Sequence, residues 1–233
     1  MDLLAEFKKK RIILFDLDGT LTDPGVGITN SVMYALKKYG ITVTERSTLY
    51  PFIGPPLIQS FEKFYGFDHE SAGDAVTAYR EYFSEKGIFE NELYEGIDAL
   101  LSHLKEQGKI LCLATSKPEV YAGRILEHFN LTKYFDIQAG SLLNGERTNK
   151  AEVIEWVMKQ LRDKHGLENP EKEALMVGDR EHDMAGAVKN HIPGVGVLYG
   201  YGSREELEMA GAKGLAATVP ELYKILTGNI FGR

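Results

Sequence analysis

Short apolar runs that alternate with amphipathic stretches restrict the fold of this chain more than any other feature of its sequence. Five such runs, each of strand length, lie at residues 12–15, 110–114, 135–137, 174–177 and 195–198. Three of them are continuously apolar, which is typical of parallel strands that are covered on both faces. Between runs, residues 97–104 carry apolar side chains at helical spacing. The alternation predicts an α/β fold with a doubly wound parallel sheet.

The segment from about residue 22 to residue 91 interrupts this alternation. It carries three helical stripes, at 28–39, 57–65 and 72–83, and no convincing strand. Turn residues, such as those of Gly54-Pro55-Pro56, separate the stripes. We therefore predict an α/β domain made of residues 1–21 and 92–233, with a helical domain of residues 22–91 inserted after the first strand.

The charge balance is mildly acidic, with 27 Lys and Arg against 34 Asp and Glu and a formal net charge of −7. Such a chain has no overall electrostatic reason to bind a nucleic acid polymer or an anionic membrane surface. The one cysteine, Cys112, excludes an intramolecular disulfide, and its apolar neighbours predict a buried thiol. No apolar run is long enough to cross a bilayer and no signal peptide is recognisable, so we expect a cytoplasmic protein.

Polar side chains follow three of the predicted strands. Asp16 and Asp18 end the first apolar run, Thr115 and Ser116 follow the second, and Asp179 follows the fourth. In an open parallel sheet the carboxyl ends of the strands form the ligand-binding edge, so these side chains should gather there. Carboxylates placed close together repel one another unless a cation lies between them. A hard divalent ion with oxygen ligands, most simply Mg²⁺, meets that need.

Lys150 is a second candidate for the site. Thr148 and Asn149 are both suitable N-caps, so Lys150 should lie in the first turn of the following helix. A cation at this positive helix end is locally unfavourable by a few tenths to about 1 kcal/mol, which suggests a functional reason for it. Together with a metal ion and hydroxyl groups, its ammonium would form a phosphate pocket. A solvated surface lysine is the alternative interpretation.

Taken together, these residues resemble the motifs of the haloacid dehalogenase-like hydrolase superfamily over essentially the whole chain. The first motif is Asp16-Leu17-Asp18-Gly19-Thr20-Leu21, the second Thr115-Ser116, the third Lys150, and the fourth Gly178-Asp179 with Asp183. The resemblance implies a Rossmann-like core and identifies residues 22–91 as the family's small α-helical cap.

Three further segments are most similar to the phosphoglycolate phosphatase-like branch of that superfamily. They are Phe52–Leu57, Thr115-Ser116-Lys117-Pro118 and Tyr199-Gly200-Tyr201-Gly202. Similar sequences are also described as 5′-nucleotidases. Specificity in such enzymes depends on a few side chains of the cap, so substitutions at residues 53–58 should change the ranking of substrates.

The resemblance implies a mechanism through a phosphoaspartate. Asp16 would be the nucleophile and a Mg²⁺ ligand. Asp18 would be the general acid and then the general base, with its backbone carbonyl as a second ligand. Asp179 would be the third ligand, and Asp183 would orient water or Lys150 from just outside. Thr115, Ser116 and Lys150 would hold the phosphoryl oxygens.

The acid at position 18 favours phosphate esters, because dehalogenation has no leaving group that needs a proton. We predict a Mg²⁺-dependent phosphatase of a small phosphorylated metabolite, phosphoglycolate-like or a nucleoside monophosphate, that is a monomer or a weak homodimer. A phosphosugar mutase similar to β-phosphoglucomutase and a non-catalytic sensor of a phosphorylated metabolite are alternatives. Arg180 is a further candidate for contact with a phosphate, whereas His182 is expected at the rim rather than on the metal.

Overall fold

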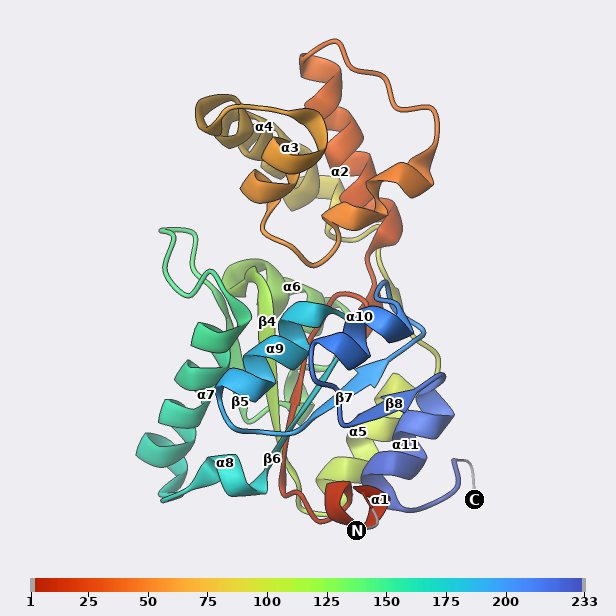
Figure 1. Cartoon of the computed structure of the whole chain (residues 1–233), viewed down its shortest axis with the longest axis vertical. Helices are drawn as coiled ribbons and strands as arrows, with labels where there is room; N and C mark the ends of the chain where they lie inside the picture. Colours follow the sequence, from red (N-terminus) through yellow and green to blue (C-terminus); the bar gives the residue numbers. More distant parts are fainter. Residues whose placement is uncertain (1–2, 232–233) are drawn as a thin grey trace.

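The computed structural model describes residues 3–231, and a parallel β-sheet forms its centre (Figure 1). Six strands pair in the order β5-β4-β1-β6-β7-β8. Their bounds are Ile12–Phe15 for β1, Ile110–Pro118 for β4, Ile137–Ser141 for β5, Ala174–Gly178 for β6, Gly194–Val197 for β7 and Gly214–Ala216 for β8. Every pairing between neighbours in this sheet is parallel.

Helices cover both faces of the sheet, and each face has its own apolar core. Ile13 and Phe15 of β1 pack in one cluster with α5 (Ile97–Glu106), α6 (Glu119–His128) and α11 (Val219–Thr227). Ile12 and Leu14 pack in the other with α7 (Lys150–His165) and α9 (Glu181–Lys189). Successive residues of a strand point to opposite faces, so a continuously apolar strand is buried on both. The predicted doubly wound α/β fold is confirmed.

The remaining short helices lie at the edges of this arrangement. They are α1 (Leu3–Phe7), α8 (Pro170–Glu173), α10 (Arg204–Met209) and a 3₁₀ turn at Thr132–Tyr134. Cys112 lies in β4 and is fully buried, as expected from its apolar neighbours. No helix within the described residues is both long and apolar enough to span a membrane.

One strand prediction needs correction, and one strand was not predicted. The strand expected at 135–137 is β5, which begins only at Ile137. The chain is still turning after residues 132–134, and the Asp136 carboxylate accepts hydrogen bonds from Lys105 Nζ and from the backbone N–H of Leu111. Residues Gly214–Ala216 form β8 at one edge of the sheet. This strand was not predicted, because three residues that include a glycine carry little pattern.

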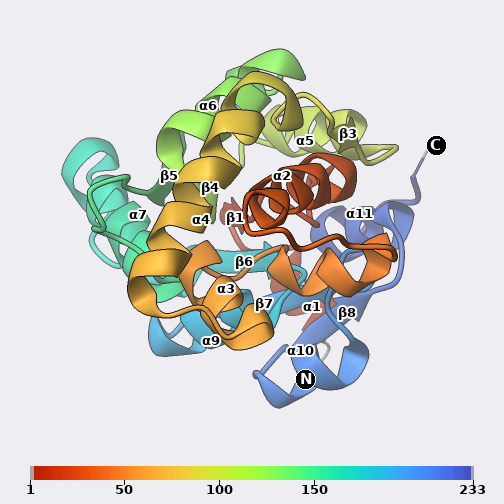
Figure 2. The same ribbon diagram turned by 90° about the horizontal axis from the view of Figure 1, so that it is seen from above.

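A block of helices stands over the carboxyl ends of the strands (Figures 1 and 2). We call residues 22–91 the helical block. It contains α2 (Gly25–Lys38), a 3₁₀ helix at Arg46–Phe52, α3 (Leu57–Tyr65), α4 (His69–Tyr82) and a π-helical turn at Phe83–Gly87. These helices match the three predicted stripes.

A two-stranded antiparallel ribbon lies where the chain enters and leaves this block. It pairs β2 (Thr22–Asp23) with β3 (Glu92–Leu93), so the expectation of no strand in residues 22–91 is wrong for β2. Two residues are too few to show a period-2 pattern, which is why the sequence did not indicate the strand. The ribbon lies at both predicted boundaries between the two domains, and the division into 1–21 with 92–233 and 22–91 stays a prediction.

Candidate active site

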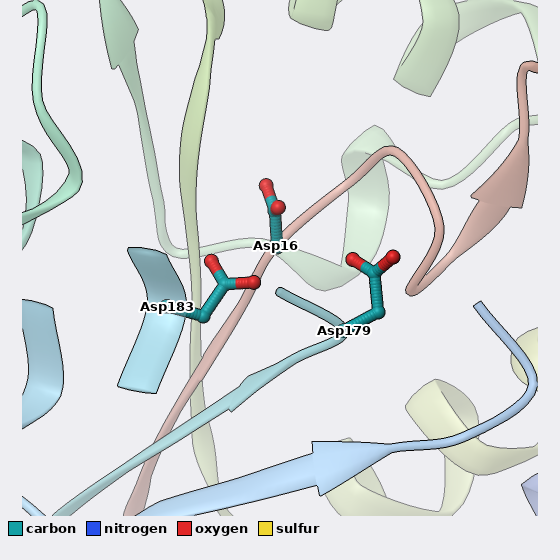
Figure 3. A group of neighbouring side chains, drawn as sticks. All are labelled: Asp16, Asp179 and Asp183. Carbon is teal, nitrogen blue, oxygen red and sulfur yellow. The ribbon is translucent and has the colours of Figure 1, made fainter. Parts of the chain in front are cut away.

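Three buried carboxylates meet at the carboxyl edge of the sheet (Figure 3). Asp16 follows β1 directly, Asp179 follows β6, and Asp183 lies in the first turn of α9. One oxygen from each can be chosen so that all three lie within 4.8 Å of one another. Of the three acids predicted to gather, Asp16 and Asp179 are found together, whereas the third carboxylate of the cluster is that of Asp183 and not that of Asp18.

Two glycines and two hydrogen bonds hold Asp179 in this cluster. Thr20 Oγ1 donates to Asp179 Oδ1 over 3.3 Å, and the backbone N–H of Tyr201 donates to Oδ2 over 2.9 Å. A Cβ atom at Gly19 would lie 2.1 Å from Asp179 Oδ2, and one at Gly200 would lie 2.5 Å from Asp179 Cβ. The glycine after Asp18 is thus required by close packing against Asp179 as well as by its positive φ of 79°.

Burial raises the pKa of two acids of this cluster, Asp179 and Asp183. Burial and the neighbouring Asp183 and Asp16 raise the pKa of Asp179 well above its ordinary value. Burial and Asp16 raise the pKa of Asp183 from 3.8 to about 6, although Lys150 opposes this increase. These are the directions expected of buried carboxylates that lie close to one another.

Lys150 is buried inside this cluster, with only 3% of its surface exposed. Its Nζ lies 2.8 Å from Asp16 Oδ1 and 2.7 Å from Asp183 Oδ1, and it donates to the carbonyl oxygen of Ala114 over 2.9 Å. Burial alone would lower the pKa of this lysine, but the two carboxylates raise it. The alternative of a solvated surface lysine is wrong.

The helix signals that placed Lys150 were correct. It is the first residue of α7, and the side chain of Asn149 caps that helix by accepting from the backbone N–H of Glu152 over 3.1 Å. Of the two N-cap candidates, Thr148 and Asn149, the structure therefore selects Asn149. The unfavourable position of a cation at a helix N-terminus is offset by two carboxylates within 3 Å.

Asp18 is buried beside a lysine to which the sequence assigned no role. Lys117 Nζ lies 2.6 Å from Asp18 Oδ2, whereas Asp18 Oδ1 is buried without a hydrogen-bond partner among the described residues. Burial raises the pKa of Asp18, and the charge of Lys117 opposes that shift. Lys117 Nζ also lies 4.6 Å from the ring centroid of Phe83 in the helical block. The sequence could have indicated this role of Lys117. Because β4 continues to Pro118, Lys117 lies two residues after Thr115 in the same strand, and such residues point to the same face.

Asp16, Asp18, Thr115 and Ser116 all open into one pocket of about 450 Å³ between the sheet edge and the helical block. Thr115 Oγ1 accepts a hydrogen bond from the backbone N–H of Lys117 over 3.2 Å. A pocket of this volume is within the range that binds small organic ligands. The structure thus places the predicted nucleophile, acid and hydroxyl groups on one wall of a single cavity.

Arg180 does not extend toward this cavity as a phosphate ligand. Its Nε donates to Glu206 Oε1 over 2.8 Å, and its NH1 donates to the carbonyl oxygen of Ile53 over 2.5 Å. Arg180 therefore ties the start of α9 to the loop before α3 and does not line the pocket, so the suggested contact with a phosphate finds no support in this arrangement. His182 is not part of the candidate metal-binding group, Asp16 with Asp179 and Asp183, that is found among the described residues. Burial lowers the pKa of His182.

Comparison with known proteins identifies the family. A family model described as haloacid dehalogenase-like hydrolase matches residues 13–197. The chain belongs to this family. A 5′-nucleotidase from Pseudomonas aeruginosa is 45% identical over 217 residues, which cover 93% of this chain and 96% of the relative. Tyrosine-protein kinase PtkA from Mycobacterium tuberculosis is 38% identical over 218 residues, covering 93% of this chain and 72% of the kinase.

A solved structure of a predicted phosphatase from Clostridium acetobutylicum has a TM-score of 0.88 and 49% sequence identity, covering 94% of this chain and 99% of that one. A phosphoglycolate phosphatase from Colwellia psychrerythraea also matches, at 24% identity over 93% of this chain and 97% of the relative. The predicted superfamily, with its phosphoglycolate phosphatase-like relatives, and the predicted hydrolase of the phosphatase class are confirmed.

Proposed function

We propose that this chain is a Mg²⁺-dependent phosphatase that works through a phosphoaspartate on Asp16. One observation carries the proposal: Asp16 is fixed 2.8 Å from the buried ammonium of Lys150, on the wall of a pocket that also holds Asp18 with an unpartnered oxygen. A nucleophile and an acid for the leaving group thus line one cavity, and the ammonium of Lys150 lies directly behind the nucleophile. Phosphoryl transfer depends mainly on such alignment and charge neutralisation.

The residues present fit a magnesium ion. The candidate ligands are the Asp16 and Asp179 carboxylates with the backbone carbonyl of Asp18, an all-oxygen set suited to a hard cation. Burial and the neighbouring Asp183 and Asp16 raise the pKa of Asp179, and close packing against two glycines fixes its position, which together support a cation site here. A bound ion would neutralise charge on Asp16 and on the phosphoryl oxygens. Asp183, which pairs with Lys150 at 2.7 Å, would orient water or Lys150 from just outside these ligands.

The chain's own groups account for both displacements. In the first, an Asp16 oxygen bonds to phosphorus, the bond from phosphorus to the ester oxygen breaks, and Asp18 gives that oxygen a proton. In the second, Asp18 takes a proton from water, the water oxygen bonds to phosphorus, and the bond to Asp16 breaks to release phosphate. Thr115, Ser116 and Lys150 hold the phosphoryl oxygens throughout. Lys117 holds Asp18 Oδ2, which leaves Oδ1 for the ester oxygen.

We infer a small phosphorylated metabolite as the substrate, phosphoglycolate-like or a nucleoside monophosphate. Support comes from the pocket volume and from the similarity to the Pseudomonas aeruginosa 5′-nucleotidase and the Colwellia psychrerythraea phosphoglycolate phosphatase. No feature of the described residues specifically favours the phosphosugar mutase.

Phosphate release tests the proposed activity. Purified protein with Mg²⁺ should release inorganic phosphate from 2-phosphoglycolate, nucleoside monophosphates or sugar phosphates. Excess chelator should abolish the release and added Mg²⁺ should restore it, because the metal neutralises the reacting charges. Full activity in chelator would refute the metal-assisted mechanism. Conversion of a hexose 1-phosphate to an isomeric phosphate, without free phosphate, would instead show a mutase.

Magnesium should stabilise the protein more at pH 8 than at pH 5. Because the pKa values of Asp179 and Asp183 are raised, the metal-free fold loses stability as the pH rises above the ordinary carboxylate range and through the pKa of Asp183 at about 6. The ion binds only ionised carboxylates. At about 100 times its Kd, Mg²⁺ should raise Tm by about 5 to 10 °C at pH 8, and by less at pH 5.

Calorimetric melting curves at the two pH values measure this difference, and Asp179→Asn is the control that should abolish the shift. Equal shifts at pH 5 and pH 8 would show that the acids are not the groups that bind the ion.

Asp18→Asn should affect the first step according to the leaving group. A phenolate leaves with little protonation, whereas an alkoxide needs a proton, so phosphoenzyme formation should slow by about 10²- to 10⁴-fold for alkyl esters and much less for p-nitrophenyl phosphate. Burst-phase kinetics separate this step from hydrolysis of the phosphoenzyme. Equal first-step losses for the two ester types would remove Asp18 from the acid role.

A further inference from the structure

The wall of the pocket that faces the leaving group is apolar and aromatic. We propose that the enzyme selects phosphate monoesters whose leaving group carries an apolar ring, over small anionic esters such as 2-phosphoglycolate. The proposal rests on the proposed phosphatase function, in which the leaving oxygen lies beside Asp18.

The helical block supplies most of this wall. Leu57 and Ile58 line the pocket from the start of α3, Val76 and Tyr79 from α4, and Phe83 from the π-helical turn that follows α4. Their side chains offer burial to an apolar group, and they offer a carboxylate no charge. Since Asp16 and Asp18 lie on the opposite, sheet-side wall, a bound ester must direct its leaving group toward these residues.

Three rings of the wall form a group that contacts the lysine partner of Asp18. Tyr79 and Phe83 stack with centroids 5.3 Å apart and an interplanar angle of 17°, and Phe83 meets Tyr121 of α6 edge-to-face at 5.5 Å. The Lys117 ammonium that pairs with Asp18 lies over the same Phe83 ring. The rings therefore begin one side chain away from the group that protonates the leaving oxygen. A ring attached through a short link to that oxygen would pack against them.

The charges around the wall disfavour a small carboxylate. Lys117 is the cation nearest the leaving group in the described pocket, and its charge is already paired with Asp18 at 2.6 Å. A carboxylate placed there would compete with Asp18 for Lys117 and would lose its hydration against apolar side chains. Arg80 of α4 also lines the pocket, and it is the residue that an anionic leaving group would need. Its role therefore decides between the two substrate classes.

Two alkyl esters separate ring recognition from chemical reactivity. Ethyl phosphate and 2-phenylethyl phosphate have leaving groups of similar basicity, so they differ mainly in the apolar ring. Burial of a phenyl group should make kcat/KM for the 2-phenylethyl ester about 10- to 100-fold higher. 2-Phosphoglycolate should have a lower kcat/KM than 2-phenylethyl phosphate. Adenosine 5′-monophosphate shows which kind of ring the wall binds. Its kcat/KM should exceed that of the 2-phenylethyl ester if the wall binds a nucleobase, and should be lower if the wall binds an aryl group.

Variants locate the preference in the rings. Phe83→Leu and Tyr121→Leu, one in the helical block and one in the core, should each reduce the ratio of kcat/KM between the 2-phenylethyl and ethyl esters by about 3-fold or more. Phe89→Leu is the matched control, because Phe89 is exposed and does not line the pocket, and it should leave the ratio unchanged. Arg80→Gln should also leave this ratio unchanged.

Binding to Asp16→Asn keeps this test independent of turnover. Calorimetric titration with Mg²⁺ present should show about 10-fold or more tighter binding of 2-phenylethyl phosphate than of ethyl phosphate. Failure of the wild-type chain to hydrolyse any ester would refute the proposed function, while this binding preference would still support the apolar wall. Equal binding of the two esters, or a preference for 2-phosphoglycolate that Arg80→Gln removes, would overturn the inference.

Discussion

Asp16→Asn is expected to abolish turnover, with a loss of about 10⁴-fold or more in kcat for every phosphate ester. A carboxamide is a poor nucleophile, so no phosphoenzyme forms and the two-step route is closed. The fold should persist, because the amide has nearly the same shape and the removed charge relieves repulsion with Asp179 and Asp183. Phosphate-release assays and circular dichroism measure the two effects separately.

Asp163→Asn is the matched control for this substitution. Asp163 lies on the exposed side of α7, where it pairs with Lys159, and it is far from any role in the mechanism. The control should retain full activity. If Asp16→Asn turned over within about 10-fold of the wild-type rate, Asp16 could not be the nucleophile.

Lys150→Met should lower kcat/KM by about 10²- to 10³-fold, and by a similar factor for every ester. The lost ammonium contacts Asp16 and is proposed to contact the phosphoryl group, which all substrates share. The substitution also leaves Asp16 and Asp183 buried without their common partner, at a cost of about 3 kcal/mol or more in the free energy of unfolding at neutral pH. Denaturant titration measures that cost.

Lys159→Met provides the control on the same helix. Lys159 is exposed and pairs with Asp163 in water, so its loss should change stability by about 0.5 kcal/mol or less and leave activity intact. A Lys150→Met enzyme that reordered its substrates, rather than weakening all of them together, would contradict the proposed contact with the phosphoryl group. Reordering is expected instead from the wall that includes Leu57 and Ile58.

The sheet and the predicted acids were accessible from sequence because their signals are local. A continuously apolar strand that ends in Asp16, or in Gly178 followed by Asp179, shows both the strand and the edge at which its polar end must lie. Lys150 could be placed in the first turn of α7 because Asn149 is an N-cap residue. Its burial could not be predicted, since that depends on Asp183, which follows a different strand.

Contacts between the side chains at the sheet edge and those of the helical block could not be predicted from the apolar periodicity of the sequence. Lys117 pairs with Asp18, 99 positions away, and lies over Phe83 of the helical block. Arg180 reaches the carbonyl of Ile53, 127 positions away. None of these contacts follows from helical or strand periodicity, and those with Phe83 and Ile53 depend on how the helical block packs against the sheet edge. The leaving-group side of the pocket is built from such contacts.

Identification of the phosphorylated residue tests the central claim most directly. The wild-type enzyme is mixed rapidly with a phosphate ester and Mg²⁺, quenched in acid within the burst phase and digested, and the peptides are examined by mass spectrometry. The mechanism predicts a phosphoryl group on Asp16, present during turnover, lost as the ester is exhausted and absent from Asp16→Asn. A burst of alcohol release without phosphorylated Asp16, or a phosphoryl group on another residue, would contradict it.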